Sequence, residues 1–431
     1  MNFSAAETYL LSLGNEVSAM KLGLSSMRRL LAELGDPQTK FLKVQIAGTN
    51  GKGSACAFLD AILRSAKLRA GLYTSPHLES MTERVKIAGE NISETDFARH
   101  ASRVRKASER LVERGDLEAV PTYFEQMTAI ALLAFKTAKV EVAILETGLG
   151  GRLAATTAAE AEIAAITRID GDHEKYLGRT LKKIAAEKAA IIRGGTAFAV
   201  IGEQSPVISR KLKARCREVE VPFVDAALIG ARRADGVVEF VTDRAAYRVK
   251  KLGLAGEHQI ENAKIAIALA EHLSGRFKIA KRDIETGLRK AVNPGRLERV
   301  GRFLLDGAHN LGGVRALAEY LRDNVDQPLT IVFAAMEDKN LRAMIQELFP
   351  LARTIVLTET TNSRSASYER LLKEMPKNLS KERTFVTDNV ASALQAAVNA
   401  DASALIVVAG SLYLVGEAKA QSARRRSECK R

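Results

Sequence analysis

The sequence has no tryptophan and only three cysteines among 431 residues. Cys56, Cys216 and Cys429 lie far apart, and their number is odd. This argues against a disulfide framework and a cysteine-based metal site, and it fits a reducing compartment. Basic stretches interleaved with aromatic residues, which stack nucleic-acid bases, are also missing. We therefore expect no nucleic-acid partner.

Long apolar runs are absent as well. No run approaches the roughly 20 residues needed to cross a bilayer. The first ten residues lack the basic region followed by an apolar core that a secretory signal requires. These absences predict a cytoplasmic protein without membrane association.

Positive charge is in excess, with a formal net charge of +14. The basic residues are spread along the chain, and the one dense run, Arg424 to Arg426 followed by Lys430 and Arg431, is typical of a solvated tail. This excess of positive charge is explained by an enzyme with small anionic substrates. The alternative is a non-catalytic protein, either a nucleotide-binding regulator or a nucleic-acid-binding protein. Hydrophobic residues make up 46% and charged residues 27%, as in a folded protein.

The length of 431 residues exceeds what one core usually serves. The chain breaks at Asn293-Pro294-Gly295, where we place the domain boundary. We predict an α/β protein with a mostly parallel, P-loop-type sheet in residues 1–294 and a smaller Rossmann-like α/β domain in residues 295–431. Expected strands are 43–47, 70–73, 140–145, 163–167, 198–202, 302–306, 329–334, 354–358 and 404–409, with short strands in 219–252. Expected helices are 22–34, 93–115, 122–137, 181–192, a helix ending near 274, 313–324, 341–348, 368–374 and 390–399.

A glycine-rich turn follows the first strand, where residues 43–54 read K-V-Q-I-A-G-T-N-G-K-G-S. Glycines let backbone N–H groups converge on phosphate oxygens, Lys52 can neutralise charge, and the Ser54 hydroxyl can ligate Mg²⁺. The spacing differs from the usual G-x-x-x-x-G-K-[ST], because Ile46 occupies the first glycine position and Gly53 separates Lys52 from Ser54. Taken alone, an ordinary glycine turn remains the alternative.

Polar residues follow several other strands, at the edge where open α/β sheets bind ligands. Glu146 ends a buried-type strand and is a candidate Mg²⁺ ligand. His77 and His173 are candidate site residues, and each is equally well explained as a hydrogen-bonded turn residue. Glu125 follows Thr122 at capping-box spacing, and Lys188 on the helix 181–192 reads by default as a solvated charge.

Together these motifs resemble the Mur-type ATP-dependent amide ligases, and within them the bacterial bifunctional folylpolyglutamate synthase/dihydrofolate synthase branch. The resemblance extends over residues 22–417. The motifs occur in the family's order: G-T-N-G-K-G-S at 48–54, T-S-P-H-L at 74–78, F-E at 124–125, E-T-G-L-G-G-R-L at 146–153, D-H at 172–173, E-K-A at 187–189, G-E-H-Q-I-E-N-A at 256–263, P-G-R-L-E at 294–298, L-D-G-A-H-N at 305–310 and A-G-S-L-Y-L-V-G-E at 409–417.

The resemblance implies an ATP-binding central domain in 1–294 and a glutamate ligase domain in 295–431. It implies two Mg²⁺ sites, with K⁺ as a further candidate cation, and a Lys188 that is carbamylated rather than solvated. Each site residue then has an expected role. The ATP phosphates are expected to bind Gly48, Thr49, Asn50, Gly51, Lys52, Gly53 and Ser54, and Mg²⁺ is expected to bind Ser54, Glu146 and His173. Asn262 is expected beside the adenine and Arg296 beside the phosphates, while Asp306 and His309 serve the nucleotide and the reacting centre. Ser75, Pro76 and Ala154 are expected near the acceptor or the metal, and Ser411 near the glutamate.

The implied activity is addition of L-glutamate to dihydropteroate, to a reduced folate, or to both. ATP would activate the acceptor carboxylate as an acyl phosphate, with release of ADP and phosphate. A ligase of the same mechanism that acts on a single or a different carboxylate is the alternative. The expected partners are these small molecules, and the expected state is a monomer.

Two departures from the family pattern occur. Residues 154–157 read A-A-T-T where the family generally has D-A-T-N, and Leu311 stands where proline commonly follows A-H-N. The carboxylate missing at Ala154 leaves three explanations open: altered acceptor specificity, an impaired or engineered protein, or compensation by nearby residues.

Overall fold

The computed structural model describes residues 1–14, 23–172, 178, 180–376 and 383–428. The chain divides into two compact units. Unit 1 comprises residues 1–169, 180–253 and 260–292, and unit 2 comprises residues 170–179, 254–259 and 293–431. The sequence-based division at residue 294 did not anticipate that two short segments, 170–179 and 254–259, would group with unit 2.

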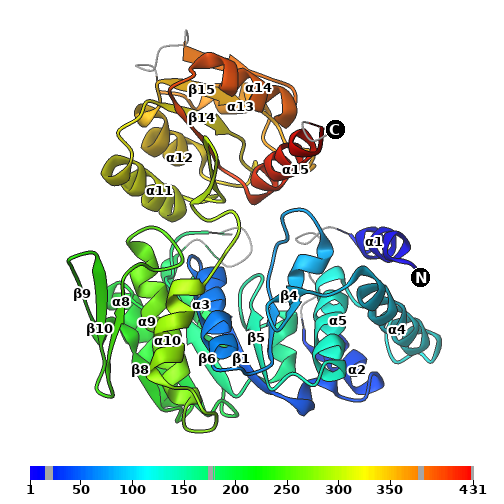
Figure 1. The fold of residues 1–431 in the computed structure, drawn as a ribbon. Helices are drawn as coiled ribbons and strands as arrows, with labels where there is room; N and C mark the ends of the chain where they lie inside the picture. Colours follow the sequence, from blue (N-terminus) through cyan, green and yellow to red (C-terminus); the bar gives the residue numbers. More distant parts are fainter. Residues whose placement is uncertain (15–22, 173–177, 179, 377–382, 429–431) are drawn as a thin grey trace. The chain divides into compact units, whose positions relative to one another are not determined.

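Unit 1 is built on an α/β sheet, as the sequence predicts (Figure 1). Among the described residues this sheet has eight strands in the order β4-β3-β2-β5-β1-β6-β7-β8. In this sheet the pairs β2–β3 and β3–β4 are antiparallel, and the other described pairs are parallel. The strands are β1 (Leu42–Ala47), β2 (Ala70–Tyr73), β3 (Val85–Ile87), β4 (Glu90–Asn91), β5 (Val142–Glu146), β6 (Ile163–Ile166), β7 (Phe198–Ile201) and β8 (Phe223–Asp225).

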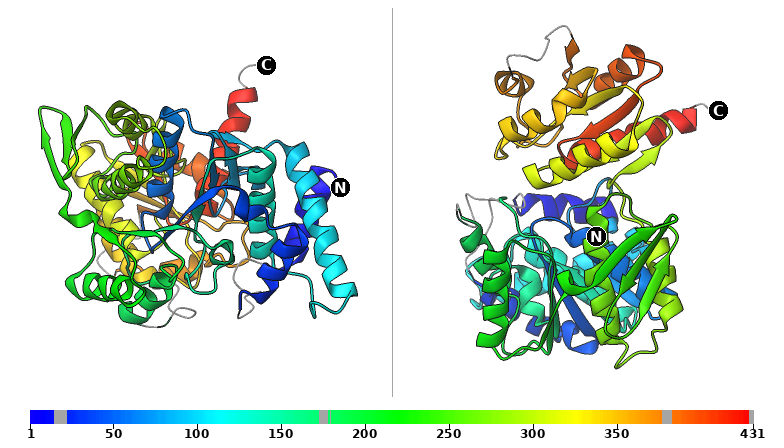
Figure 2. Two further views of the ribbon diagram at one scale, coloured as in Figure 1. Left: turned by 90° about the horizontal axis from the view of Figure 1, so that it is seen from below. Right: turned by 90° about the vertical axis from the view of Figure 1, so that its left-hand side faces the viewer.

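Helices cover both faces of this sheet (Figure 1, Figure 2). They are α1 (Phe3–Ser12), α2 (Ser25–Glu33), α3 (Lys52–Ser65), α4 (Glu94–Glu113), α5 (Tyr123–Thr137), α7 (Leu181–Ala189), α8 (Pro206–Glu218), α9 (His258–Leu273) and α10 (Lys281–Lys290). Helices α1, α2, α4 and α5 share one apolar core, in which Leu30, Phe97 and Phe135 are fully buried. Helices α1, α8 and α10 were not expected from the sequence. Helix α10 has few apolar residues, and it packs against α3, with Gly287 close to the backbone of Ile62.

A small antiparallel sheet also belongs to unit 1. Its strands are β9 (Gly230–Ala234), β10 (Val237–Val241) and β11 (Ala246–Val249), in the order β11-β10-β9. Glu271 of α9 anchors it, because its carboxylate accepts hydrogen bonds from Thr242 Oγ1 at 2.6 Å and from the Tyr247 hydroxyl at 2.8 Å. The short strands expected within 219–252 are therefore confirmed.

Unit 2 contains a second α/β sheet, which the described residues form from six strands in the order β12-β13-β17-β14-β15-β16. Its pairs are parallel except β12 with β13, so the expected open, mostly parallel sheet is confirmed. The strands are β12 (Glu298–Val300), β13 (Phe303–Asp306), β14 (Leu329–Phe333), β15 (Thr354–Leu357), β16 (Thr384–Val386) and β17 (Leu405–Ala409). The helices are α11 (Leu311–Asn324), α12 (Leu341–Leu348), α13 (Tyr368–Lys373), α14 (Val390–Ala400) and α15 (Leu412–Glu428).

Across the described part of the chain, none of the helices is both long enough and apolar enough to cross a membrane.

Candidate functional site

The loop 48–51 joins β1 to α3, in the strand, loop and helix arrangement that the sequence predicts. Gly48 has φ 154° and Gly51 has φ 90°, which is the left-handed region. A Cβ on Gly48 would lie 1.9 Å from Thr167 Oγ1, and one on Gly51 would lie 2.1 Å from Asn262 Oδ1. Both positions therefore require glycine, and the loop backbone lies directly against the end of β6 and against α9.

The N–H groups of the loop are not all directed at a ligand. Those of Thr49 and Asn50 both donate to the Arg168 carbonyl, at 2.8 and 3.2 Å. The first intrahelical bond of α3 runs from Ala55 N to the Gly51 carbonyl. The N–H groups at positions 51–54 lie at the positive end of the α3 dipole, where a phosphate binds favourably.

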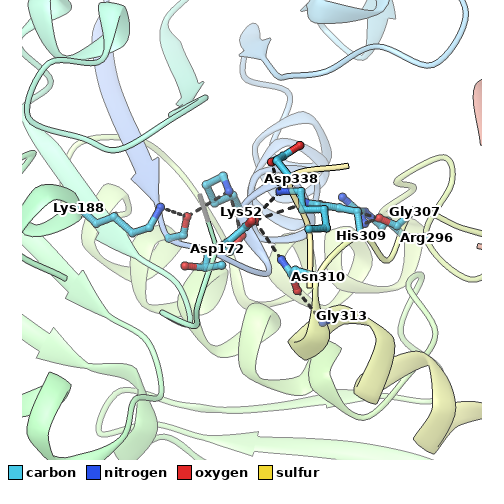
Figure 3. A network of polar contacts seen from close by, with 12 residues as sticks. Lys52, Asp172, Lys188, Arg296, Gly307, His309, Asn310, Gly313 and Asp338 are labelled. Atoms are coloured by element: carbon cyan, nitrogen blue, oxygen red, sulfur yellow. Dashed lines mark hydrogen bonds and ion pairs between the residues drawn. The ribbon is translucent and has the colours of Figure 1, made fainter. Parts of the chain in front are cut away.

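Two lysine ammonium groups meet at the same loop. Lys52 Nζ donates to the carbonyls of Gly48 and Thr49, at 3.1 and 3.0 Å. Lys188 Nζ, from α7, donates to the Gly48 carbonyl at 2.7 Å, and the contact is visible in Figure 3. Lys188 is only 5% exposed, so the solvated interpretation from the sequence is wrong. Two cations and a helix N-terminus at one loop create a positive potential suited to an anionic ligand.

Glu146 lies at the end of β5, beside the loop, because its register partner in β1 is Ile46. The carboxylate is buried and accepts a hydrogen bond from Ser75 N at 3.0 Å. Burial raises the pKa of the Cys56 thiol, and the Glu146 carboxylate raises it further, which places that carboxylate near the first turns of α3.

A metal at this place would find oxygen donors from Ser54 and Glu146, which is the donor type that Mg²⁺ prefers. Ser54 is buried in the first turn of α3. The third expected ligand, His173, lies outside the described residues. Within the described ranges, no group of three or more His, Cys, Asp or Glu side chains is arranged to hold a metal. The metal ligand set therefore stays a prediction.

The loop that carries Ser75 and Pro76 is fixed by residues that the sequence analysis missed. The Glu83 carboxylate accepts from the backbone N–H groups of residues 78–80, each at 2.9 Å. Arg84 is buried, its Nε donates to His77 Nδ1 at 2.7 Å, and its guanidinium lies 5.4 Å from the centre of the Tyr123 ring. His77 is therefore a hydrogen-bonded loop residue. The available signal was the capping box that begins at Ser80.

Two further sequence interpretations concern unit 1. Glu125 forms a capping box with Thr122 at the start of α5, as its spacing predicts. Asn262, the expected adenine neighbour, is buried on α9 against Gly51, so it lies beside the phosphate loop. Ala154 is partly exposed and directly precedes the 3₁₀ helix η3 (Ala155–Ala159).

In unit 2, the expected residues Arg296 and Asp306 hold a loop together. Asp306 is buried at the end of β13, and its carboxylate accepts from Leu297 N at 2.8 Å and Ala308 N at 2.9 Å. Arg296 Nη1 donates to the Gly307 carbonyl at 3.0 Å. Burial raises the pKa of Asp306, and the Arg296 guanidinium and these hydrogen bonds oppose that rise. Both side chains thus shape the turn that precedes His309.

A buried ionic cluster follows this turn (Figure 3). Lys339 Nζ lies 2.6 Å from Asp172 Oδ1, and the two side chains are 5% and 7% exposed. Asn310 Nδ2 donates to Asp172 Oδ2 at 3.2 Å, and His309 Nε2 lies 3.8 Å from the same oxygen. Lys339 was not expected from the sequence, although it follows β14 at the ligand-binding edge of the sheet.

His309 is neutral in this cluster. A carbonyl oxygen can only accept, so Nδ1 carries the proton that is donated to the Gly307 carbonyl at 2.8 Å. The pKa of His309 is lowered to about 4, chiefly by burial; the Asp172 carboxylate opposes this, and the charges of Lys339 and Arg296 add to it. Nε2 is therefore left as a hydrogen-bond acceptor.

Ser411 lies after β17 at the start of α15. It is buried, and its Oγ accepts from Tyr413 N at 3.1 Å, as a helix-capping serine does. The structure thus gathers the expected phosphate-loop residues, Lys188, Glu146 and Asn262 within unit 1. It gathers Arg296, Asp306 and His309 within unit 2.

Two protein families match this chain. The Mur ligase middle domain matches residues 46–270. The Mur ligase, glutamate ligase domain, matches residues 295–412.

Relatives match almost the whole chain. A dihydrofolate synthase/folylpolyglutamate synthase from Bacillus subtilis is 33% identical over 92% of this chain and 94% of its own length. Probable bifunctional folylpolyglutamate synthase/dihydropteroate synthases from Halobacterium salinarum and Haloferax volcanii are 35% and 36% identical over 97% and 93% of this chain. The chain spans only 51% and 48% of these two proteins, about half their length.

Solved structures agree with the fold. A Mycobacterium tuberculosis folylpolyglutamate synthase complexed with ADP superposes with a TM-score of 0.89, at 30% identity, over 97% of both chains. Escherichia coli FolC in complex with DHPP and ADP gives a TM-score of 0.87, at 28% identity, over 99% of both chains.

Proposed function

Because the chain belongs to the Mur ligase family, in the branch of dihydrofolate and folylpolyglutamate synthases, we propose that it is an ATP-dependent amide ligase. Its proposed reaction adds L-glutamate to dihydropteroate, to a reduced folate, or to both. The observation that carries this proposal is the loop at Gly48–Gly51, where the Lys52 ammonium group and the N-terminus of α3 converge.

The acceptor carboxylate is a poor electrophile and must first be activated. A carboxylate resists attack by an amine, because it is negatively charged and has no good leaving group. Transfer of the γ-phosphoryl group of ATP to a carboxylate oxygen gives an acyl phosphate and ADP. The α-amine of L-glutamate then attacks the acyl carbon, phosphate leaves with the bonding electrons, and an amide remains after loss of the amine proton. Lys52 and the helix N-terminus would offset the charge on the transferring phosphoryl group.

Ser54 and Glu146 would hold Mg²⁺, together with the expected ligand His173. Bound there, the metal would neutralise charge on the nucleotide phosphates. A second Mg²⁺ and a K⁺ ion are part of the proposal, as is carbamylation of Lys188. Lys188 is buried and its Nζ lies 2.7 Å from the Gly48 carbonyl, so a carbamate on it would lie beside the phosphate loop.

In unit 2 we assign nucleotide binding to Arg296 and Asp306 and glutamate binding to Ser411. His309 would orient the attacking amine by accepting a hydrogen bond at Nε2. A pKa of about 4 makes His309 a weak base at neutral pH, since an effective general base has a pKa near the working pH. Orientation is therefore a better role for it than deprotonation.

The acceptor-binding loop is where the sequence departs from the family pattern. Ala154 and Thr157 stand where the family has Asp and Asn, so a ligase of the same mechanism that uses a single or a different carboxylate is the second candidate. Cytoplasmic localisation, a monomeric state and the absence of a nucleic-acid partner remain predictions. Nucleic-acid binding that weakens steeply with salt, without ATP turnover, would favour the non-catalytic alternative.

The test is phosphate release from ATP in the presence of L-glutamate, with dihydropteroate, dihydrofolate or tetrahydrofolate as acceptor. We expect release that requires both glutamate and at least one acceptor. Lys52→Ala should lower it by about 100-fold or more while the protein stays folded. Lys182→Ala, which removes an exposed lysine of α7, is the control. Full turnover by Lys52→Ala would refute the phosphate-loop assignment.

A further inference from the structure

A glutamine side chain lies fully buried in the middle of β1, just before the phosphate loop. Gln45 is 0% exposed, and its Nε2 lies 3.1 Å from Thr147 Oγ1, 3.1 Å from Thr156 Oγ1 and 2.8 Å from Thr157 Oγ1. The three threonines belong to the loop between β5 and β6, which also carries Ala154. They are all buried. One amide group therefore connects the central strand to both ends of the segment 147–157.

The direction of these hydrogen bonds follows from proton counting. The Thr157 hydroxyl donates its single proton to the Gly151 carbonyl at 2.7 Å. Its oxygen must then accept from Gln45, which assigns the NH₂ group of the amide to this side. One N–H goes to Thr157, and the other is shared between Thr147 and Thr156. Removal of the amide would leave these buried hydroxyl oxygens without their donor.

The loop is also held from the opposite side, by α7. Arg152 N donates to the Glu187 carbonyl at 2.9 Å, and Arg152 Nε lies 3.0 Å from Glu187 Oε1. A Cβ on Gly151 would lie only 2.5 Å from the Glu187 carbonyl oxygen. Gly151 thus packs tightly on the backbone of α7, so that Ala154 lies between an anchor on α7 and an anchor on β1.

This arrangement explains what Thr157 does. Its hydroxyl links the loop to Gln45 and closes the loop on Gly151 at the same time. The network contains no charged side chain, so it fixes the loop without supplying a charge to a ligand. We propose that Gln45 is a positioning residue which, through Thr157, fixes the acceptor-binding loop 147–157 and thereby sets the affinity for the acceptor. The part that concerns acceptor affinity rests on the proposed ligase function.

The first experiment measures the position of the loop without any substrate. Hydrogen–deuterium exchange of peptides covering 147–157 is compared between the wild type, Gln45→Met and Thr157→Val. Both variants keep the approximate side-chain size and remove the polar group. We expect exchange in these peptides to become at least about tenfold faster, and Thr157→Ser, which keeps the hydroxyl, to restore it. Unchanged exchange in Thr157→Val would overturn the proposal.

A control separates positioning from general destabilisation. Gln126 is another fully buried glutamine of unit 1; its Nε2 donates to the Tyr9 hydroxyl at 2.9 Å and to the Pro121 carbonyl at 3.1 Å. Gln126→Met should leave exchange in 147–157 unchanged while it lowers the melting temperature. Equal acceleration of the loop in Gln126→Met would overturn the specific role of Gln45. If Gln45→Met does not fold, Thr157→Val and Thr157→Ser still decide the question.

The second experiment uses steady-state kinetics. For Thr157→Val we expect KM for the acceptor to rise by about tenfold or more, with KM for ATP within about twofold of wild type, and rescue by Thr157→Ser. Equal changes in the KM values of ATP and acceptor would indicate a structural role only and would overturn the affinity claim. An inactive wild type would instead refute the proposed ligase function, and the exchange experiment would still test the positioning of the loop.

Discussion

Replacement of Gly51 by alanine tests the geometry of the phosphate loop directly. Gly51 has φ 90°, and an added Cβ would lie 2.1 Å from Asn262 Oδ1. The variant therefore introduces two separate penalties at one position. One is backbone strain, and the other is a collision with the side chain that we expect beside the adenine.

The size of each penalty can be estimated. A non-glycine residue in the left-handed region costs about 1–2 kcal/mol. To reach ordinary van der Waals contact at 3.4 Å, the Asn262 amide or the loop must move by about 1.3 Å, the difference between 3.4 and 2.1 Å. A misplacement of about 1 Å in a catalytic arrangement costs about 100-fold in rate. We thus expect Gly51→Ala to lower kcat/KM for ATP by about 100-fold and the free energy of unfolding by about 1–2 kcal/mol.

The assay combines phosphate-release kinetics with urea unfolding, and Gly236→Ala is the matched control. Gly236 has φ 72°, and a Cβ there would meet no atom within 4 Å. Its alanine variant should lose about 1 kcal/mol of stability and keep full activity. In the double variant Gly51→Ala/Asn262→Ala the collision is gone, so the effect of the alanine at 51 should shrink relative to Asn262→Ala alone. Wild-type kinetics for Gly51→Ala, or an undiminished effect beside Asn262→Ala, would refute this reasoning.

Three further outcomes follow from buried groups and from the acceptor loop. Burial, with smaller effects of Arg99 and Arg103, lowers the pKa of His100 on α4 to about 4. Between pH 6.5 and 4 the unfolded chain therefore binds a proton that the folded chain does not, and the free energy of unfolding should fall by up to about 3 kcal/mol as the pH is lowered through this range. Urea unfolding of His100→Leu should show a flatter pH dependence. Lys339→Met removes the cation beside the buried Asp172 carboxylate and should lower the free energy of unfolding of unit 2 by about 3–5 kcal/mol. The double variant Lys339→Met/Asp172→Asn should recover part of this lost stability in the same assay. Ala154→Asp restores the family carboxylate and should raise kcat/KM for dihydropteroate relative to tetrahydrofolate by about tenfold; an unchanged ratio would show that this position does not select the acceptor.

The elements best predicted from the sequence are those with strong local signals. The capping box at Thr122 and Glu125 marks the start of α5, and the turn after Tyr73 ends β2 at the expected residue. The regular alternation of strands and helices after residue 300 likewise matches the unit 2 sheet. In these segments the local pattern and the tertiary packing favour the same structure.

The elements and residues that were missed depend on contacts between distant segments. The local pattern reads Lys188 as a solvated helix charge, and only the family resemblance gave it a role in the site; in the structure, burial and the Gly48 carbonyl replace water around it. Lys339 gains its partner Asp172 from a segment 167 residues away along the chain. Helix α10 has a mostly charged sequence with a narrow apolar face, and it is stabilised by the packing of that face on α3.

Gln45 shows how such a contact leaves a trace in the sequence. A central strand of a parallel sheet is buried on both faces and reads as a near-continuous apolar run, so a glutamine inside it is an exception. A buried amide is costly unless it is hydrogen-bonded, and the Gln45 NH₂ group finds its acceptors in the hydroxyl oxygens of Thr147, Thr156 and Thr157. The polar residue in β1 and the threonine at the family's asparagine position are therefore two parts of one local solution. Of the two departures at 154–157, Thr157 therefore has a structural role as an anchor of the loop, whereas Ala154 takes no part in this hydrogen-bond network.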